Sequence, residues 1–279
     1  MKRKLILFFL IFISVSPLFS YSVESTGSSM LKGMGNAGVA MEGVIDGVFY
    51  NPANIMVQRK NLIDAIYSFN NKFGITGYYV NSLGIQLPTL VFGQQFSLYS
   101  ALTVEQESIT GLITKQNLGL SLGLIDMGNI HIGVGLHDLR ISFADGNFPT
   151  QNQFYADIGV IVKYLSPLKF GVIFNTLDFT KDTFYNNLKL GFSYIFEKYA
   201  LIMNGDIKLT NDPFFKNGYL AMINVGLEKM ITPGLFLRAG VKNEKITLGL
   251  GVAISKLKID YAYDMTTLND HQVSLKYKF

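Results

Sequence analysis

The sequence predicts an all-β protein, an antiparallel up-and-down β-barrel that crosses a membrane with about fourteen strands, or with twelve as the alternative. Two observations lead to this prediction. Apolar and polar residues alternate along most of the chain, as they do from Val273 to Phe279, and successive side chains of a strand point to opposite faces. The alternating segments are also close to the roughly 9–11 residues that a tilted strand needs to cross a bilayer.

Fourteen segments show this alternation or are needed to complete an even number. They are 61–70, 79–92, 95–104, 115–125, 130–141, 153–164, 169–177, 188–196, 201–209, 219–228, 235–242, 246–255, 256–265 and 271–279. Pro88 lies inside the second segment, where a proline is tolerated only at a bulge or a strand end.

The connections between these segments support a membrane barrel. Counted back from Phe279, short turns alternate with longer loops, including a longer loop expected from Glu105 to Gly111. Only the short connection at Asn243-Glu244 breaks the alternation. Outer-membrane barrels have short periplasmic turns and longer external loops, whereas a soluble sheet has no reason to sort its loops in this way.

The two faces of the strands differ in composition. One face is apolar, and the other carries glycines and charges of both signs. A barrel of this many strands is too wide for side chains to fill as a dry core. We therefore expect the apolar face to meet lipid and the mixed face to line the lumen, with a soluble β-sandwich as the alternative. The expected lumen charges, which we interpret as balancing one another, are Asp157, Lys163, Lys189, Asp206, Lys208, Glu228, Arg238 and Lys242.

Residues 1–22 have the pattern of a secretory signal peptide. Lys2-Arg3-Lys4 precede an apolar run from Leu5 to Phe19, and small residues follow. We expect cleavage after Ser20 or Ser22 and a location in the bacterial outer membrane; an uncleaved anchor is the alternative. Three of the 24 Lys and Arg lie in this leader and none of the 20 acidic residues does. The apparent basicity therefore belongs mostly to the leader, and no basic patch predicts a nucleic-acid partner.

Few residues are suited to catalysis or metal binding. The chain has no cysteine, which excludes disulfides and thiolate chemistry, and neither a His-x-x-x-His nor a G-x-S-x-G pattern occurs. His131 and His137 are expected on the inward face of one strand, roughly 20 Å apart along it, too far to share a metal. We therefore expect no catalytic residues, no metal and no cofactor. A hydrolase that uses either histidine ranks third among the functions considered.

Residues 23–60, before the predicted barrel at 61–279, are rich in Gly, Ala and Met and lack alternation. Gly33, Gly35 and Gly38 spell G-x-G-x-x-G, but no strand precedes them and no βαβ unit follows, so we reject a dinucleotide site. The segment is either a compact coil whose glycines permit close packing or a plug in the barrel mouth. The candidate plug and gating residues are Gly33, Gly35, Asn36, Asp46, Tyr50, Asn51, Pro52 and Ala53.

The motif in this segment resembles that of FadL-type outer-membrane barrels, particularly the PorV/PorQ-like (UPF0164) branch. The resemblance lies in Gly33 to Ala37, Ala40, Asp46 and Tyr50 to Ala53, and in the end of the chain. There, Val273, Leu275, Tyr277 and Phe279 resemble the signal that the barrel-assembly machinery recognises.

The resemblance implies a fourteen-stranded barrel with an N-terminal hatch. In FadL itself it implies uptake of long-chain fatty acids or other hydrophobic compounds, whereas PorV-like relatives act as secretion-system shuttles. We therefore expect a passive transporter or channel for small hydrophobic molecules, gated by the plug. The alternative is a secretion shuttle or structural protein that docks a protein partner. The expected partners are outer-membrane lipid, the assembly machinery, and a hydrophobic molecule or a secretion protein.

Overall fold

A computed structural model describes twelve stretches of the chain. They are residues 29–41, 50–57, 64–72, 79–86, 90–104, 107–143, 151–165, 167–178, 187–211, 219–242, 244–265 and 270–278. The predicted signal peptide at 1–22, the candidate plug residue Asp46 and the terminal Phe279 lie outside these residues.

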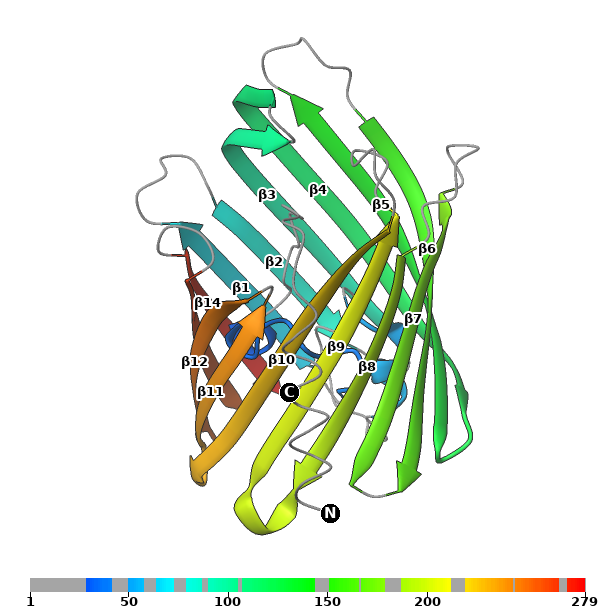
Figure 1. Ribbon diagram of the computed structural model, residues 1–279, viewed down its shortest axis with the longest axis vertical. Coiled ribbons are helices and arrows are strands. Elements are labelled where there is room, and N and C mark those ends of the chain that lie inside the picture. The colour runs from blue at the N-terminus through cyan, green and yellow to red at the C-terminus, as the bar shows by residue number, and fades with distance from the viewer. Residues whose placement is uncertain are drawn as a thin grey trace.

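The described strands form one closed antiparallel barrel (Figure 1). They are β1 (Asp64–Lys72), β2 (Tyr79–Gln86), β3 (Leu90–Val104), β4 (Glu107–Asp126), β5 (Ile130–Phe143), β6 (Gln151–Leu165), β7 (Leu168–Asp178), β8 (Asn187–Phe196), β9 (Leu201–Asn211), β10 (Tyr219–Thr232), β11 (Leu235–Lys242), β12 (Lys245–Ile254), β13 (Leu257–Asp264) and β14 (Asp270–Lys278). Each strand pairs with its neighbours in sequence, and β1 pairs with β14 to close the ring. The predicted up-and-down barrel and its strand number are confirmed for the described part of the chain.

Two predicted boundaries were wrong. The segment 79–92 is not one strand, because β2 ends at Gln86 and β3 begins at Leu90. The two strands pair with each other in antiparallel fashion, with Gln86 opposite Val91. Pro88 lies outside the described residues.

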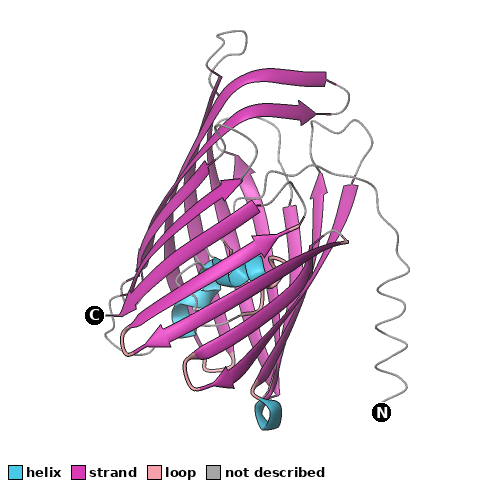
Figure 2. Ribbon diagram, turned by 90° about the vertical axis from the view of Figure 1, so that its left-hand side faces the viewer, coloured by secondary structure: helices cyan, strands magenta, loops and turns pink. Residues whose placement is uncertain are grey.

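The predicted loop from Glu105 to Gly111 is largely strand, because Val104 pairs with Glu107 and the ladder continues from there. Figures 1 and 2 show this β3–β4 hairpin rising above the other strands and bending over. Ladder hydrogen bonds join backbone groups, so a polar hairpin without alternation can continue them.

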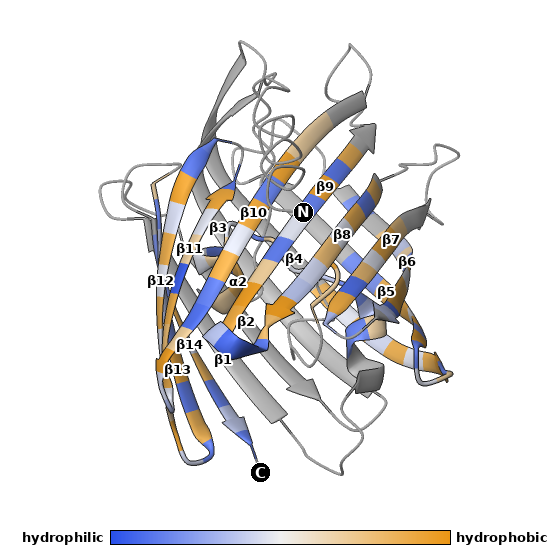
Figure 3. Cartoon of the chain, turned by 60° about the horizontal axis from the view of Figure 1, so that its bottom comes forward, coloured by the Kyte–Doolittle hydropathy of each residue, from blue (hydrophilic) through white to orange (hydrophobic). Residues whose placement is uncertain are grey.

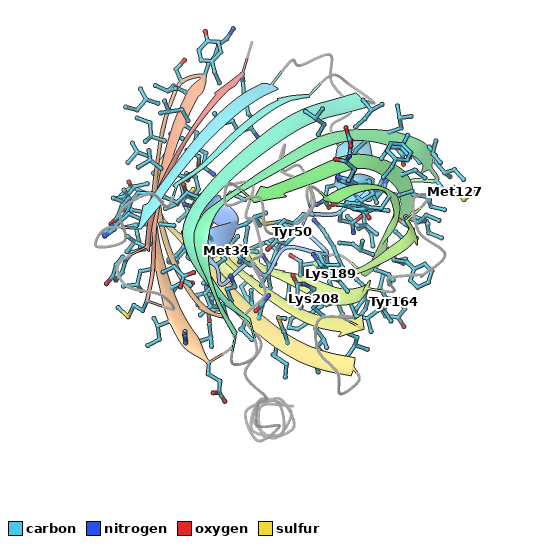
Figure 4. All side chains as sticks on the ribbon, turned by 90° about the horizontal axis from the view of Figure 1, so that it is seen from above. Met34, Tyr50, Met127, Tyr164, Lys189 and Lys208 are labelled. Atoms are coloured by element: carbon cyan, nitrogen blue, oxygen red, sulfur yellow. The ribbon has the colours of Figure 1, made fainter. Side chains whose placement is uncertain are left out.

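Burial along the strands is the reverse of that in a soluble sheet. On β12, Leu248 and Leu250 are 43% and 42% exposed, whereas Thr247 between its apolar neighbours is 0% exposed. On β5 the apolar residues are the more exposed set, and both histidines are buried. Figure 3 shows the alternation along the strands, and Figure 4 shows side chains such as Met127 and Tyr164 pointing away from the ring. An outer surface this apolar is suited to hydrocarbon, so the predicted orientation of the two faces is confirmed.

Short helical elements lie inside the barrel (Figure 2). The helix α2 (Ser29–Gly33) contacts β11 to β14, and the 3-10 helix η2 (Pro52–Val57) contacts β4 to β6. A third element, η3 (Glu197–Tyr199), forms the turn between β8 and β9. In the described stretches, no helix has both the length and the apolar character to span a membrane.

Glycines on the inner wall make room for this N-terminal segment, which we define as residues 29–41 and 50–57. At each of seven glycines, a Cβ atom would come within 3.1 Å of an atom of the segment. Several face one another across neighbouring strands: Gly133 is opposite Gly159, and Gly226 is opposite Gly240. We call this set the glycine belt; it consists of Gly133, Gly159, Gly171, Gly191, Gly226, Gly240 and Gly249.

Gly226→Val should displace the N-terminal segment while leaving the barrel folded. A Cβ at this position would overlap the carbonyl oxygen of Met34 and lie 2.6 Å from its Cβ, but valine is favoured in strands. Overpacking of this kind costs about 1–3 kcal/mol. We therefore expect cleavage within residues 29–41 by added protease to be about ten-fold faster, with unchanged mobility of the barrel on an unheated SDS gel.

The matched control is Gly205→Val, because the three atoms nearest to a Cβ at Gly205 all belong to the side chain of Phe192. That ring can move. Equal protection of residues 29–41 in Gly226→Val and in the unmodified protein would contradict close packing against the belt.

Candidate functional site

The N-terminal segment begins with α2 and then reverses direction in a left-handed turn. Gly35 and Asn36 have φ values of 65° and 60°, a conformation that glycine adopts freely and asparagine tolerates better than most residues. The amide of Asn36 donates to the Leu31 carbonyl at 2.8 Å, and that of Gly35 donates to the Lys32 carbonyl at 3.1 Å. The glycine-rich motif is therefore a helix-ending turn, in agreement with our rejection of a dinucleotide site.

The two parts of the segment are held to each other. The Tyr50 hydroxyl donates to the Asn36 carbonyl at 2.5 Å, and the Asn51 side-chain amide donates to the Val39 carbonyl at 2.7 Å. The Tyr50 ring also belongs to a buried apolar cluster with Met30, Leu31, Met34 and Met41. Seven of the eight candidate plug residues, all but Asp46, thus lie in one packed unit inside the barrel. Figure 4 shows Tyr50 of this unit together with Met34.

Polar side chains on one half of the wall hold residues 29–39 in place. On β12, the Thr247 hydroxyl accepts from the Gly35 amide at 2.9 Å and lies 3.2 Å from the Gly33 carbonyl, to which it can donate. On β9, the Asp206 carboxylate accepts from the amides of Gly38 at 2.6 Å and Val39 at 3.1 Å.

Two further hydrogen bonds complete this attachment. Asn204 on β9 donates to the Ala37 carbonyl at 3.2 Å, and Ser274 on β14 accepts from the Ser29 amide at 3.2 Å. This half of the segment is therefore attached to β9, β12 and β14.

Asn51, Pro52 and Ala53, which we call the hatch turn, meet the wall differently. Pro52 lies against Gly133 and Gly159 of the glycine belt. The hydrogen bonds of the turn are directed to Val39 and, from the Ala53 amide to the Asn51 side chain at 3.0 Å, to itself. Among the described residues, the turn makes no hydrogen bond to the barrel wall. It is held there by packing and through its attachment to residues 29–41.

A charged cluster covers the inner wall next to α2. The Arg238 guanidinium lies 2.6 Å from Glu228 and 2.7 Å from Asp260, and all three residues are buried. The Lys258 ammonium is 3.8 Å from Asp260 and 3.4 Å from the sulfur of Met30. Here the lumen charges do balance one another. Removing one partner of such a buried group leaves an uncompensated charge, so the cluster makes this side of the lumen resistant to rearrangement.

The two histidines face inward as predicted, and each has its own carboxylate. His131 lies 3.2 Å from Asp126, and His137 lies 3.0 Å from Asp157. They lie on opposite sides of Gly133, against which the hatch turn packs. Within the described stretches, no group of three or more His, Asp or Glu side chains is placed to hold a metal ion.

The sequence analysis missed Ser121, which lies beside His137. Ser121 pairs with Gly135, and Gly135 pairs with Asp157, so β4, β5 and β6 bring serine, histidine and aspartate together. A catalytic triad uses one imidazole nitrogen for the acid and the other for the serine. Here Nε2 of His137 pairs with Asp157, and Ser121 Oγ makes no hydrogen bond to either nitrogen. These three side chains therefore do not have the geometry of a Ser-His-Asp triad.

The predicted assembly signal lies on the outer face. Val273, Leu275 and Tyr277 are exposed, alternating with buried Gln272 and Ser274. Their recognition by the assembly machinery stays a prediction.

Comparison with known proteins supports the fold. No family model and no curated protein matches the chain. Solved structures do match. The toluene transporter TodX of Pseudomonas putida has a TM-score of 0.60 at 11% identity, covering 95% of this chain and 98% of its own. A FadL homologue of Pseudomonas aeruginosa has a TM-score of 0.64 at 12% identity, covering 92% and 98%. The toluene transporter TbuX of Ralstonia pickettii has a TM-score of 0.58 at 11% identity, covering 90% and 97%. The chain thus has the fold of the FadL-type barrels.

Asp206→Asn should loosen the attachment of the segment to β9. The carboxylate accepts from two backbone amides, and hydrogen bonds to a charged group contribute about 1.5–3 kcal/mol each. An asparagine keeps one acceptor oxygen and loses the charge. We expect the Gly38 and Val39 amides to exchange with deuterium about ten-fold faster or more, measured by hydrogen exchange of the folded barrel.

Glu228→Gln serves as the control, because Glu228 pairs with Arg238. Exchange at Gly38 and Val39 that responds equally to both substitutions would show a general loss of stability and contradict the specific role of Asp206.

Proposed function

We propose that the protein is a passive transporter of small hydrophobic molecules in the bacterial outer membrane, gated by the N-terminal segment. The observation that carries this proposal is the combination of an apolar outer surface with a lumen that a separate part of the chain occupies. A barrel that only anchored itself in lipid would not need a wall fitted with glycines to a polypeptide inside it. TodX and TbuX, which share the fold, are toluene transporters.

The moving part in this proposal is the hatch turn. Residues 29–39 are hydrogen-bonded to three strands, whereas the hatch turn rests on Gly133 and Gly159 without a hydrogen bond to the wall in the described residues. Among the described residues, lifting the hatch turn breaks no hydrogen bond between the turn and the wall. Movement driven by thermal fluctuation and by the ligand gradient requires no other energy source.

Location and partners follow from the same proposal. Removal of residues 1–22 in the periplasm, recognition of the final strand by the assembly machinery and insertion into lipid would deliver a functional barrel. The proposal includes no catalytic step. Membership of the PorV-like branch, with a secretion protein bound by the external loops, remains a second hypothesis that none of the three similar structures supports.

A reversible disulfide tests the moving part. The natural chain has no cysteine, so Pro52→Cys with Gly159→Cys introduces a single pair, at positions where a Cβ on Gly159 would lie 3.0 Å from the Pro52 Cγ. Bacteria that carry the protein should take up the hydrophobic dye N-phenyl-1-naphthylamine faster than cells without it. Oxidation of the pair should reduce uptake to background, and a reductant should restore it, as followed by fluorescence.

A second pair provides the matched control. Val39→Cys with Gly191→Cys ties the attached half of the segment to β8, at a Cβ–Cβ separation of 2.7 Å that must widen slightly for the bond. This lock should leave uptake unchanged. Uptake that persists when residues 52 and 159 are joined would refute the hatch turn as the gate.

A further inference from the structure

Ser121 carries a buried hydroxyl group on a part of the inner wall where its inward-facing neighbours are glycines. It is 0% exposed, and its Oγ has no hydrogen-bond partner among the described residues. Its neighbours on the inward face of β4 are Gly119 and Gly123, and Gly135 lies opposite on β5. An unpaired buried hydroxyl costs about 1–3 kcal/mol, so its presence calls for a partner.

The rings of His137 and Tyr155 form the inner wall beside Ser121. A Cβ on Gly135 would lie 3.0 Å from His137 Nε2 and 3.3 Å from Ser121 Oγ, so both atoms border the same point. The rings of His137 and Tyr155 are stacked, with centroids 4.6 Å apart and planes 10° apart. Asp157, on β6, holds the His137 imidazole in place through the 3.0 Å contact with its Nε2 atom.

This group lies next to the hatch turn. Pro52 packs on Gly133 of β5, two residues before Gly135. It also packs on Gly159 of β6, two residues after Asp157. The 3-10 helix that Pro52 begins contacts all three strands that carry the group. Displacement of the hatch turn would therefore uncover a wall with the Ser121 hydroxyl and the stacked rings of His137 and Tyr155.

We propose that Ser121, beside the stacked rings of His137 and Tyr155, forms a hydrogen-bonding subsite for hydrophobic molecules that carry a hydroxyl group, and that it favours them over bare hydrocarbons. This inference rests on the proposed transport function, whose ligand class it narrows. A ligand hydroxyl can donate and accept at once, so it satisfies Ser121 Oγ in either role. A bare hydrocarbon of the same shape would leave that oxygen unpaired and lose affinity.

Binding of a matched pair of probes tests the subsite. 4-Fluorobenzyl alcohol and 4-fluorotoluene differ in one hydroxyl, and fluorine NMR reports their binding to the full protein held in an amphipathic polymer. The unmodified protein should bind the alcohol more tightly than the toluene. Ser121→Ala should weaken binding of the alcohol about three- to ten-fold and leave that of the fluorotoluene unchanged.

Ser193→Ala is the control, because Ser193 is also a buried, inward-facing serine but lies on β8. It should change neither affinity. Equal affinities for the two probes in the unmodified protein, or a loss in Ser121→Ala that affects both probes alike, would overturn the proposal.

The outcome is separable from that of the transport proposal. If the disulfide between residues 52 and 159 fails to block dye uptake while Ser121→Ala weakens only the alcohol, the subsite stands and the gate falls. If the disulfide blocks uptake and Ser121→Ala has no selective effect, the gate stands and the subsite falls.

Discussion

The closed backbone ladder is the constraint on which the rest of this structure depends. In hydrocarbon no water can satisfy an open N–H or C=O group, so a sheet that crosses a bilayer must close on itself. Pairing of β1 with β14 from Asp64 to Lys72 provides that closure. Once the ladder is closed, the outer face is free to be apolar, and polar side chains that a soluble sheet would expose, such as Asp206 and Arg238, are buried inside.

A closed barrel of fourteen strands leaves an interior that side chains alone do not fill. In this protein the interior receives a piece of backbone, and the wall is fitted to it in two ways. The glycine belt lets the segment approach closely, and Thr247, Asn204 and Asp206 bind its amides and carbonyls. The two kinds of contact are unevenly distributed. Hydrogen bonds hold residues 29–39, whereas in the described part of the chain only close packing holds the hatch turn to the wall. This unevenness is the physical basis of the proposed gate.

The barrel was predictable from the sequence to a large extent, because alternation and loop parity are local properties. Strand number, order and the orientation of the faces followed from them. The end of β2 at Gln86, the start of β3 at Leu90 and the long β3–β4 hairpin did not, since a strand can end or continue without a change in hydropathy.

The candidate site was predictable only in part. The Gly-Asn turn and Tyr50-Asn51-Pro52 were identified as one segment because they are close in sequence. The pairing of Ser121 with Gly135, or of Arg238 with Glu228 and Asp260, depends on strand register, and register is set by the closed ring as a whole.

The most direct measurement of the central claim, that the apolar faces meet lipid, is nitroxide accessibility along β10 at single cysteines replacing Met222, Ile223, Asn224 and Leu227. Labels at 223 and 227 should be accessible to oxygen in the bilayer and shielded from a water-soluble nickel complex, with labels at 222 and 224 protected from oxygen. Greater accessibility of 223 and 227 to the nickel complex than to oxygen would contradict the account.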